Sequence, residues 1–268
     1  MGKFKFVKRF NKRTSQGSVG ILEYIDPLDK DIEESTIEAR DFILNTASND
    51  SKYIVYKIGM ETPYLSTHEY VISTSLYTST SKFLPTFVRP YGLIFDVNSN
   101  PSKSNPFKSG TQVNDLMLYE HIHSCASLAN IIEKKLLPYN MVNSLLNQLM
   151  LSILVAQTKV DFVHNDLHFD NVLVSKCLKR TFMIYIFKTK DSDEVKYALI
   201  PTYGYYPVVI DYGFSFTKDI LDRNLYIGIH HNNKGYITYR YDEYTDFKTM
   251  LIRSVSYTHL RAHETLMN

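Results

Sequence analysis

The stretch "FVHNDLHFDNVLV", residues 162 to 174, places imidazole, amide and carboxylate groups between two apolar flanks. Burying a carboxylate costs several kcal/mol unless a partner or a metal ion compensates. Packing alone therefore gives no reason for this composition. We interpret the stretch as a site.

A second polar position follows an apolar run further along the chain. In "VVIDYGFS" the carboxylate of Asp211 ends a predicted strand, and Gly213 allows a turn. The runs 172–174 and 208–210 are expected to pair as strands, which would hold Asn171 and Asp211 near each other. A polar turn with a capping Asp explains either segment well, but it explains both poorly.

The spacing of these residues resembles the protein-kinase superfamily. His164, Asp166 and Asn171 fit H-x-D-x-x-x-x-N, and "DYG" fits D-[FY]-G. Other signals of the family occur in its order, namely "SQGSVGIL", Lys57, Glu69 and "LMLYEHI", followed by the two motifs. The resemblance covers roughly residues 10 to 253 and is closest to divergent Ser/Thr kinase-like proteins of large DNA viruses.

The resemblance implies an α+β, bilobal fold with an antiparallel β-rich N-lobe and a helical C-lobe. We expect the N-lobe over residues 1–122 and an incomplete C-lobe over 123–253, with an inserted hairpin at about 176–207. Residues 254–268 lack apolar periodicity and are predicted to be a non-native tail. Asp246 is expected to lie on a helix and to anchor the loop that carries the first motif.

The implied activity is phosphotransfer, with ATP and Mg²⁺ as cofactors. This reaction depends mainly on positioning groups and neutralising charge. Asp166 is predicted to orient the acceptor hydroxyl and accept its proton, and Lys57 to bind phosphate. Mg²⁺ prefers hard oxygen ligands, so Asn171 and Asp211 are its predicted ligands. His168 is expected to contact the transferring phosphate, with packing in the loop as the alternative.

The partner predicted for Lys57 is Glu69. On a helix that begins after Thr62, Glu69 shares a face with apolar residues at helical spacing, namely Leu65, Ile72 and Leu76. A carboxylate on an inward face needs a cation, and Lys57 lies on the preceding strand. The alternative is that Glu69 sits at the edge of the stripe and reaches water.

A second group of residues is predicted to contact the nucleotide. These residues are Gly17, Gly20, Lys57, Glu69, Glu120, Ile122 and Leu173. Glycines allow close approach of backbone to phosphate, although Ser15 stands where the motif has its first glycine, and a plain β-turn explains the same segment. Glu120 and Ile122 are assigned to the adenine hinge by resemblance, and an ordinary strand end would look the same.

Two departures from the family pattern bear on substrate and regulation. Asn165 replaces the arginine that pairs with a phosphorylated activation loop in regulated protein kinases, so such switching is not expected. His168 replaces a lysine common in Ser/Thr kinases, and "HNDLHFDN" also resembles kinases of aminoglycosides or choline. Protein Ser/Thr is the favoured acceptor. A small alcohol, or a non-catalytic nucleotide-binding scaffold, stays open.

The elements that would position the predicted site residues are mostly strands in the first part of the chain and helices in the second. Strands are predicted within 4–25 and over 52–59, 91–96 and 115–122, and a helix over 62–77. From residue 128 to about 160 the apolar residues recur at helical spacing, for example Val142, Leu145, Leu149 and Ile153.

Composition restricts the partners. A net charge of +2 does not favour nucleic-acid binding, and the N-terminal basic residues are interpreted as a solvated face. The most apolar window, residues 141–160, is interrupted by polar residues and makes a poor membrane span. Cys125 and Cys177 lack metal-ligand spacing and fit a reducing compartment. We therefore expect a cytoplasmic protein, in the host cytoplasm or a virion if viral, of unknown oligomeric state.

Overall fold

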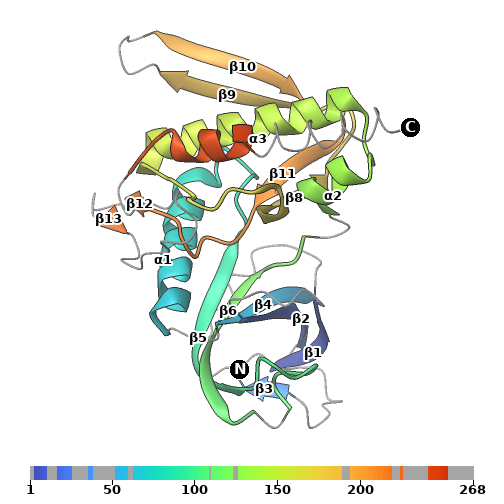
Figure 1. Cartoon of the computed structure of the whole chain (residues 1–268), viewed down its shortest axis with the longest axis vertical. Helices are drawn as coiled ribbons and strands as arrows, with labels where there is room; N and C mark the ends of the chain where they lie inside the picture. Colours follow the sequence, from blue (N-terminus) through green and yellow to red (C-terminus); the bar gives the residue numbers. More distant parts are fainter. Residues whose placement is uncertain are drawn as a thin grey trace. The chain divides into compact units, whose positions relative to one another are not determined.

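The computed structural model describes residues 3–10, 17–25, 36–38, 52–59, 63–108, 110–122, 126–188, 194–218, 224–225 and 241–252 of the 268-residue chain. The chain forms two compact units. The first comprises Met1–Thr74 and Arg89–His121, and the second comprises Ser75–Val88 and Ile122–Asn268. The first unit is β-rich and the second holds most of the helix, so the predicted α+β class is confirmed (Figure 1).

A six-stranded antiparallel sheet builds the first unit, in the order β3-β1-β2-β4-β6-β5. Its strands are β1 (Lys3–Arg9), β2 (Gly17–Ile25), β3 (Thr36–Glu38), β4 (Tyr53–Gly59), β5 (Pro90–Ser99) and β6 (Gln112–Glu120). Each predicted strand of this region is therefore present. The short β3, which pairs with β1, was not predicted.

Strand β4 shows how the sheet separates its core from its other face. Ile54, Tyr56 and Ile58 are buried in one apolar cluster together with Leu22 and Leu118. Successive side chains of a strand point to opposite faces. Lys57 therefore projects away from this cluster, as the sequence alternation predicts.

Helix α1 (Pro63–Thr80) follows β4 in the chain. Its residues up to Thr74 belong to the first unit and the rest to the second. Glu69, Ile72 and Leu76 are buried, which confirms the predicted inward face. Thr62, after which the helix was predicted to begin, lies outside the described residues.

The helices of the second unit are α2 (Leu128–Glu133) and α3 (Tyr139–Val160), and residues 245–252 are also helical. Leu145, Leu149 and Ile153 of α3 are fully buried, as their spacing predicts. The helix ends where Asp161 adopts a left-handed conformation and its N–H donates to the Gln157 carbonyl. None of the helices in the described part of the chain combines the length and the apolar character needed to cross a bilayer.

Three groups of short strands complete the second unit. One sheet has the order β11-β8-β7, and two antiparallel pairs are β9–β10 and β12–β13. The bounds are β7 (Ala126–Ser127), β8 (Val172–Lys176), β9 (Phe182–Lys188), β10 (Val195–Pro201), β11 (Tyr205–Val209), β12 (Thr217–Lys218) and β13 (Asn224–Leu225). Val172 pairs with Val209 and Leu173 with Val208, which confirms the predicted pairing of the two apolar runs. The β9–β10 pair is the predicted inserted hairpin.

Candidate active site

The loop between α3 and β8 carries the first motif and is fixed by backbone bonds on both sides. Val163 and Phe216 exchange two backbone hydrogen bonds, of 2.9 and 2.8 Å. The ring of His164 is buried, and its Nε2 lies 3.0 Å from the Ile210 carbonyl oxygen, while its Nδ1 accepts from the Asp166 N–H at 3.3 Å. These two bonds favour the tautomer with the proton on Nε2. His164 thus connects the loop to the residue before Asp211.

Asp246 holds the same loop through both of its carboxylate oxygens. Oδ2 accepts from the His164 N–H at 2.8 Å, and Oδ1 accepts from the Asn165 N–H at 3.0 Å. The predicted anchor is therefore confirmed. The side chain is fully buried, and this burial raises the pKa of the Asp246 carboxyl above its ordinary value, while the two N–H donors act in the opposite direction.

Two hydrogen bonds to the Asp166 carbonyl oxygen organise the part of the loop that carries the predicted catalytic carboxylate. Asn171 Nδ2 donates to the Asp166 carbonyl oxygen at 3.0 Å, and His168 N–H donates to the same oxygen at 2.9 Å. The side chain of Asp166 is 22% exposed to solvent. His168 Nε2 lies 3.8 Å from Asp166 Oδ2, so the imidazole and the carboxylate are neighbours at the surface of the loop.

The predicted magnesium ligands fit that ion by their chemistry. The amide nitrogen of Asn171 is engaged with Asp166, which leaves Oδ1 as the atom suited to a cation. Its own carbonyl oxygen accepts from the Ile210 N–H at 3.0 Å, so Asn171 lies beside the residue preceding Asp211. In the described ranges no three His, Cys, Asp or Glu side chains gather as a metal group. Two protein oxygens are nevertheless enough for Mg²⁺, which commonly takes its other ligands from phosphate and water.

Asp211 is held in an unusual backbone conformation. Its φ is +68°, in the left-handed region that residues other than glycine seldom adopt. Strained backbone of this kind concentrates at ligand sites and switch regions, where surrounding structure imposes it. Here Tyr212, directly after Asp211, is fully buried and its hydroxyl donates to the Val209 carbonyl at 2.7 Å.

In the first unit, Lys57 and Glu69 form the predicted ion pair. Lys57 Nζ lies 2.7 Å from Glu69 Oε2, and the side chains are 12% and 2% exposed. The second carboxylate oxygen, Oε1, accepts from the Tyr119 hydroxyl at 3.3 Å. The carboxylate is therefore held from two sides, by a strand lysine and by a tyrosine of β6.

The two predicted phosphate glycines have a structural reason of their own. Gly17 has φ +146° and pairs with Gly59 on β4, and a Cβ at Gly17 would overlap the Ile58 carbonyl oxygen. A Cβ at Gly20 would collide with the Lys8 carbonyl oxygen and the Tyr56 ring. Packing against β4 and β1 thus requires glycine at both positions, whether or not phosphate approaches. Ser15 lies outside the described residues.

Glu120 ends β6 and is engaged at its backbone and side chain. Its N–H donates to the Arg89 carbonyl at 3.0 Å, and its Oε1 accepts from the Arg89 N–H at 2.8 Å. Burial raises the pKa of the Glu120 carboxyl, with the Arg89 N–H acting the other way. The predicted adenine contact would therefore fall to the carbonyl of Glu120 and not to its N–H.

The remaining predicted nucleotide residues lie in the second unit. Leu173 is half-buried on β8, opposite Val208 of β11 and Ser127 of β7, and it alternates with the buried Val172 and Val174. Ile122 is half-buried just after β6. Their contact with a nucleotide stays a prediction.

Comparison with known proteins agrees with this arrangement. The family model described as "Haspin like kinase domain" matches residues 26–260, most of the chain. The chain belongs to the haspin-like kinase domain family. The match begins after Gly17 and Gly20, and it includes Lys57, Glu69 and all the residues of the two motifs.

Two viral relatives match this chain along nearly its whole length. "Uncharacterized protein 098R" of Invertebrate iridescent virus 6 is 45% identical over 291 residues, covering 93% of this chain and 48% of the relative. "Uncharacterized protein 038R" of Invertebrate iridescent virus 3 is 33% identical over 275 residues, covering 95% and 48%. The chain spans about half the length of the curated relatives it matches. The predicted resemblance to kinase-like proteins of large DNA viruses is confirmed.

Two residues of the haspin-like domain acquire contacts that were not predicted. Tyr119 donates to Glu69, and the Asn165 amide donates to the Phe214 carbonyl at 3.0 Å, joining the loop to the segment after "DYG". Strand alternation could have indicated Tyr119, because Tyr119 pairs with Val55 on the strand of Lys57. No sequence signal indicates the bond of Asn165, since it joins loops 49 residues apart.

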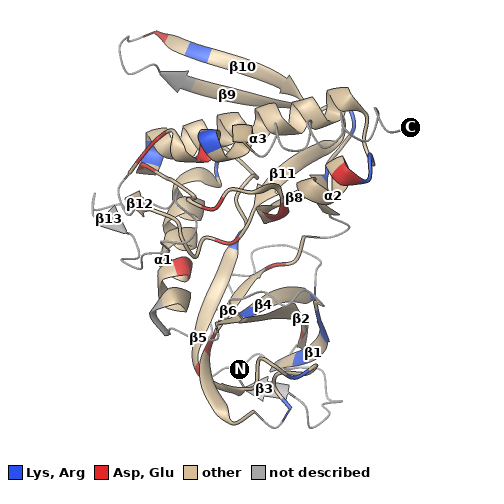
Figure 2. Cartoon of the chain, in the orientation of Figure 1, with Lys and Arg blue, Asp and Glu red and all other residues tan. Residues whose placement is uncertain are grey.

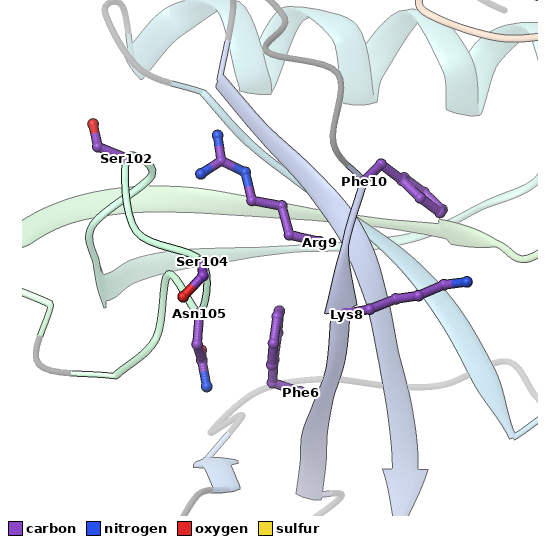
Figure 3. A pocket seen from close by; sticks show the side chains of 7 residues that line it. All are labelled: Phe6, Lys8, Arg9, Phe10, Ser102, Ser104 and Asn105. Atoms are coloured by element: carbon purple, nitrogen blue, oxygen red, sulfur yellow. The ribbon is translucent and has the colours of Figure 1, made fainter.

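A cavity of about 440 Å³ lies elsewhere in the β-rich unit, and none of the predicted site residues lines it. Arg9, which lines the cavity, donates to the Lys103 carbonyl oxygen at 2.9 Å. Lys8 and Phe10 extend to the opposite side of β1 from Ser102 and Asn105 (Figure 3). Because these groups do not converge on one point, we assign the cavity no role in the haspin-like domain.

Proposed function

We propose that the protein is an ATP-dependent phosphotransferase that transfers the γ-phosphate to a hydroxyl group. One observation carries the proposal. Asp246 accepts hydrogen bonds from two N–H groups of the loop that carries Asp166 and so holds that loop in place. The Asn171 amide nitrogen donates to the Asp166 carbonyl, so the Asp166 carboxylate can act as a base and the Asn171 Oδ1 can bind a cation. Membership of the haspin-like family supports the reaction class.

Each residue has a distinct proposed task. Asp166 orients the acceptor hydroxyl and takes its proton. General-base catalysis of this kind raises the rate about 10²–10⁴-fold. Asn171 and Asp211 hold Mg²⁺, which neutralises phosphate charge when bound. Lys57 binds the phosphates as a point charge, and Glu69 fixes its position through the 2.7 Å ion pair.

His168 is the proposed second contact to the transferring phosphate. Its imidazole is 30% exposed and lies 3.8 Å from Asp166 Oδ2, so it can donate to an oxygen of a group held by that carboxylate. His168 stands where many Ser/Thr kinases have a lysine, which would donate to the same phosphate oxygen.

Protein Ser/Thr is the favoured acceptor, because the family model that matches describes a protein-kinase-like domain. A small alcohol such as an aminoglycoside or choline is the alternative from the same reaction class.

The proposed location is cytoplasmic, in the host cell or in a virion. It is proposed because the two cysteines, Cys125 and Cys177, fit a reducing compartment.

Transfer of radiolabelled γ-phosphate tests the proposal. Purified chain is incubated with Mg·ATP and a generic protein acceptor, aminoglycosides or choline, beside the variants Asp166→Ala and Asp211→Ala. Asp170→Ala is the matched control, because Asp170 is an exposed carboxylate of the same loop with no proposed role. Transfer should fall by about 10² or more in the first two variants and stay unchanged in the third.

Two outcomes would count against the proposal. Transfer that persists in Asp166→Ala and Asp211→Ala would show that other residues do the chemistry. Binding of Mg·ATP with no transfer to any acceptor would favour a nucleotide-binding scaffold. The acceptor that is labelled decides between protein and small-molecule substrates.

A further inference from the structure

The inserted hairpin carries an apolar face that no described residue covers. Six large side chains of β9 and β10 are between 54% and 80% exposed, namely Phe182, Ile184, Ile186, Val195, Tyr197 and Leu199. Scattered apolar residues on a surface need no explanation. A set confined to one two-stranded ribbon is different, because its members adjoin one another.

The strand register shows that these side chains form one continuous face. Tyr197 lies opposite Ile186, and Leu199 lies opposite Ile184, so the two rows are direct cross-strand neighbours. Positions two apart on a strand share a face, which adds Phe182 and Val195 to the same side. These six residues carry no charge, and most of β10 has the colour of uncharged residues in Figure 2.

The opposite face of the ribbon is already covered by α3. Tyr185 is 1% exposed, its hydroxyl donates to the Gln148 carbonyl at 3.0 Å, and it lies 3.3 Å from the Ser152 hydroxyl. Ser144 of α3 also donates to the Pro201 carbonyl. Figure 1 shows the hairpin lying along α3, within the second unit. The ribbon is therefore held with its apolar rows facing outward.

We propose that this outer face, the hairpin face, is the contact surface for a second copy of the chain. Six side chains of this size, each more than half exposed, present about 600 Å² of apolar surface. A stable interface takes about 800 Å² per partner, so the face with its polar rim approaches what a dimer needs. In a two-fold dimer the same face packs against itself, and apolar sheets stack well face to face.

The chemistry of the face favours a protein over a membrane. Surfaces that bind anionic lipid combine apolar side chains with neighbouring cations. The six side chains of the hairpin face carry no charge, and Lys196 alternates with them on the other side of β10. The register places a single lysine, Lys188, in line with them, opposite Val195 at the end of the ribbon. A two-stranded ribbon is also only marginally stable alone, so covering its second face gains stability.

The mass of the chain in solution tests the proposal. Light scattering of the unmodified chain over a range of micromolar concentrations should show conversion from 31.2 kDa to twice that mass. In Ile184→Thr/Leu199→Thr the dimer dissociation constant should rise about tenfold or more. Val113→Thr is the matched control, because Val113 is an exposed β-branched strand residue of the other unit, at 61%. It should leave the constant unchanged.

Hydrogen exchange provides a second measurement on the unmodified chain. Amides of 182–201 should exchange more slowly at high protein concentration than at low, and those of β5 should not change. Asp166→Ala should dimerise normally, because the hairpin face does not depend on phosphotransfer. A monomer at every concentration overturns the proposal, as does a dimer that the double variant leaves intact. A monomer that instead floats with lipid vesicles overturns it in favour of a membrane, and masses that grow without limit overturn it in favour of aggregation.

Discussion

Lys57 Nζ lies 2.7 Å from Glu69 Oε2, and the two side chains retain only 12% and 2% of their exposure. A second ion pair of similar length, Lys218 to Asp161 at 2.9 Å, is about one-third exposed on both sides. Distance is thus nearly equal in the two pairs and burial differs. Since burial decides the cost of an unpaired charge, the two pairs should respond differently to the loss of one partner.

Lys57→Met should lower the free energy of unfolding by about 3 kcal/mol, because it leaves the Glu69 carboxylate buried without its cation. Lys57→Met/Glu69→Leu should recover part of that loss. Lys218→Met should cost less than about 1 kcal/mol. Urea unfolding measures all three variants, and equal costs for the two lysines would show that burial is not the deciding factor.

Tyr119→Phe removes only the hydroxyl that donates to Glu69 at 3.3 Å. We expect a loss of about 1 kcal/mol in unfolding free energy. If Glu69 positions Lys57 for phosphate, the KM for ATP should also rise while the pH profile of kcat is kept. Tyr24→Phe is the control, since Tyr24 contributes its ring to a contact with Phe4. An unchanged KM in Tyr119→Phe would limit Tyr119 to a structural role.

Gly17→Ala should destabilise the protein by about 2 kcal/mol or more even in the absence of nucleotide. The reason is the φ of +146° and the overlap of a Cβ with the Ile58 carbonyl. Gly59→Ala is a fitting comparison, because a Cβ there would meet the movable Ser66 Oγ at 2.9 Å. Thermal unfolding reports both. If Gly17→Ala weakens only ATP binding and leaves the melting temperature unchanged, the packing account is wrong.

Asp246→Ala removes the acceptor of two buried N–H groups, those of His164 and Asn165. Each orphaned donor costs about 1–3 kcal/mol, so a loss of about 3 kcal/mol is expected, together with loss of phosphotransfer. Asp242→Ala, in the same segment, should cost about 1 kcal/mol, since Asp242 accepts from the exposed Tyr244 N–H just before the helical residues 245–252. Transfer assayed where both variants are folded would separate loop positioning from stability. Normal transfer by Asp246→Ala would contradict the anchor.

The raised pKa of the Glu120 carboxyl predicts that the stability of the protein depends on pH. Burial raises its pKa in the folded state above the ordinary 4.5, so the unfolded chain loses this proton first as pH rises. The folded state then binds more protons, and the contribution of Glu120 to stability falls as pH rises through the window above 4.5. Glu120→Gln keeps an acceptor for the Arg89 N–H and should gain stability relative to the unmodified chain across that window. Urea unfolding between pH 4 and 7 measures the difference, and the opposite slope would contradict the pKa direction.

Much of the arrangement was predictable where a short-range rule applies. Strand alternation and helical spacing placed Lys57 and Glu69 on facing surfaces, and the two apolar runs beside Asn171 and Asp211 were predicted to pair. The hairpin was visible as alternation between 176 and 207. The anchor Asp246 was assigned by family resemblance, and no periodicity indicated it. The chemical roles of Asp166, His168, Asn171 and Asp211 stay predictions.

The sequence by itself determined the kinds of element, their order and the reactive groups at their ends, because these depend on periodicities of two and 3.6 residues within one segment. Only the tertiary structure decided which atoms meet across long separations. The bond from Asp246 to His164 joins residues 82 apart, and the Tyr119 bond to Glu69 joins residues 50 apart. The choice of hairpin face that packs on α3 belongs to the same class. Such contacts depend on strand register and on the packing of one element against another, and no local pattern records either of these.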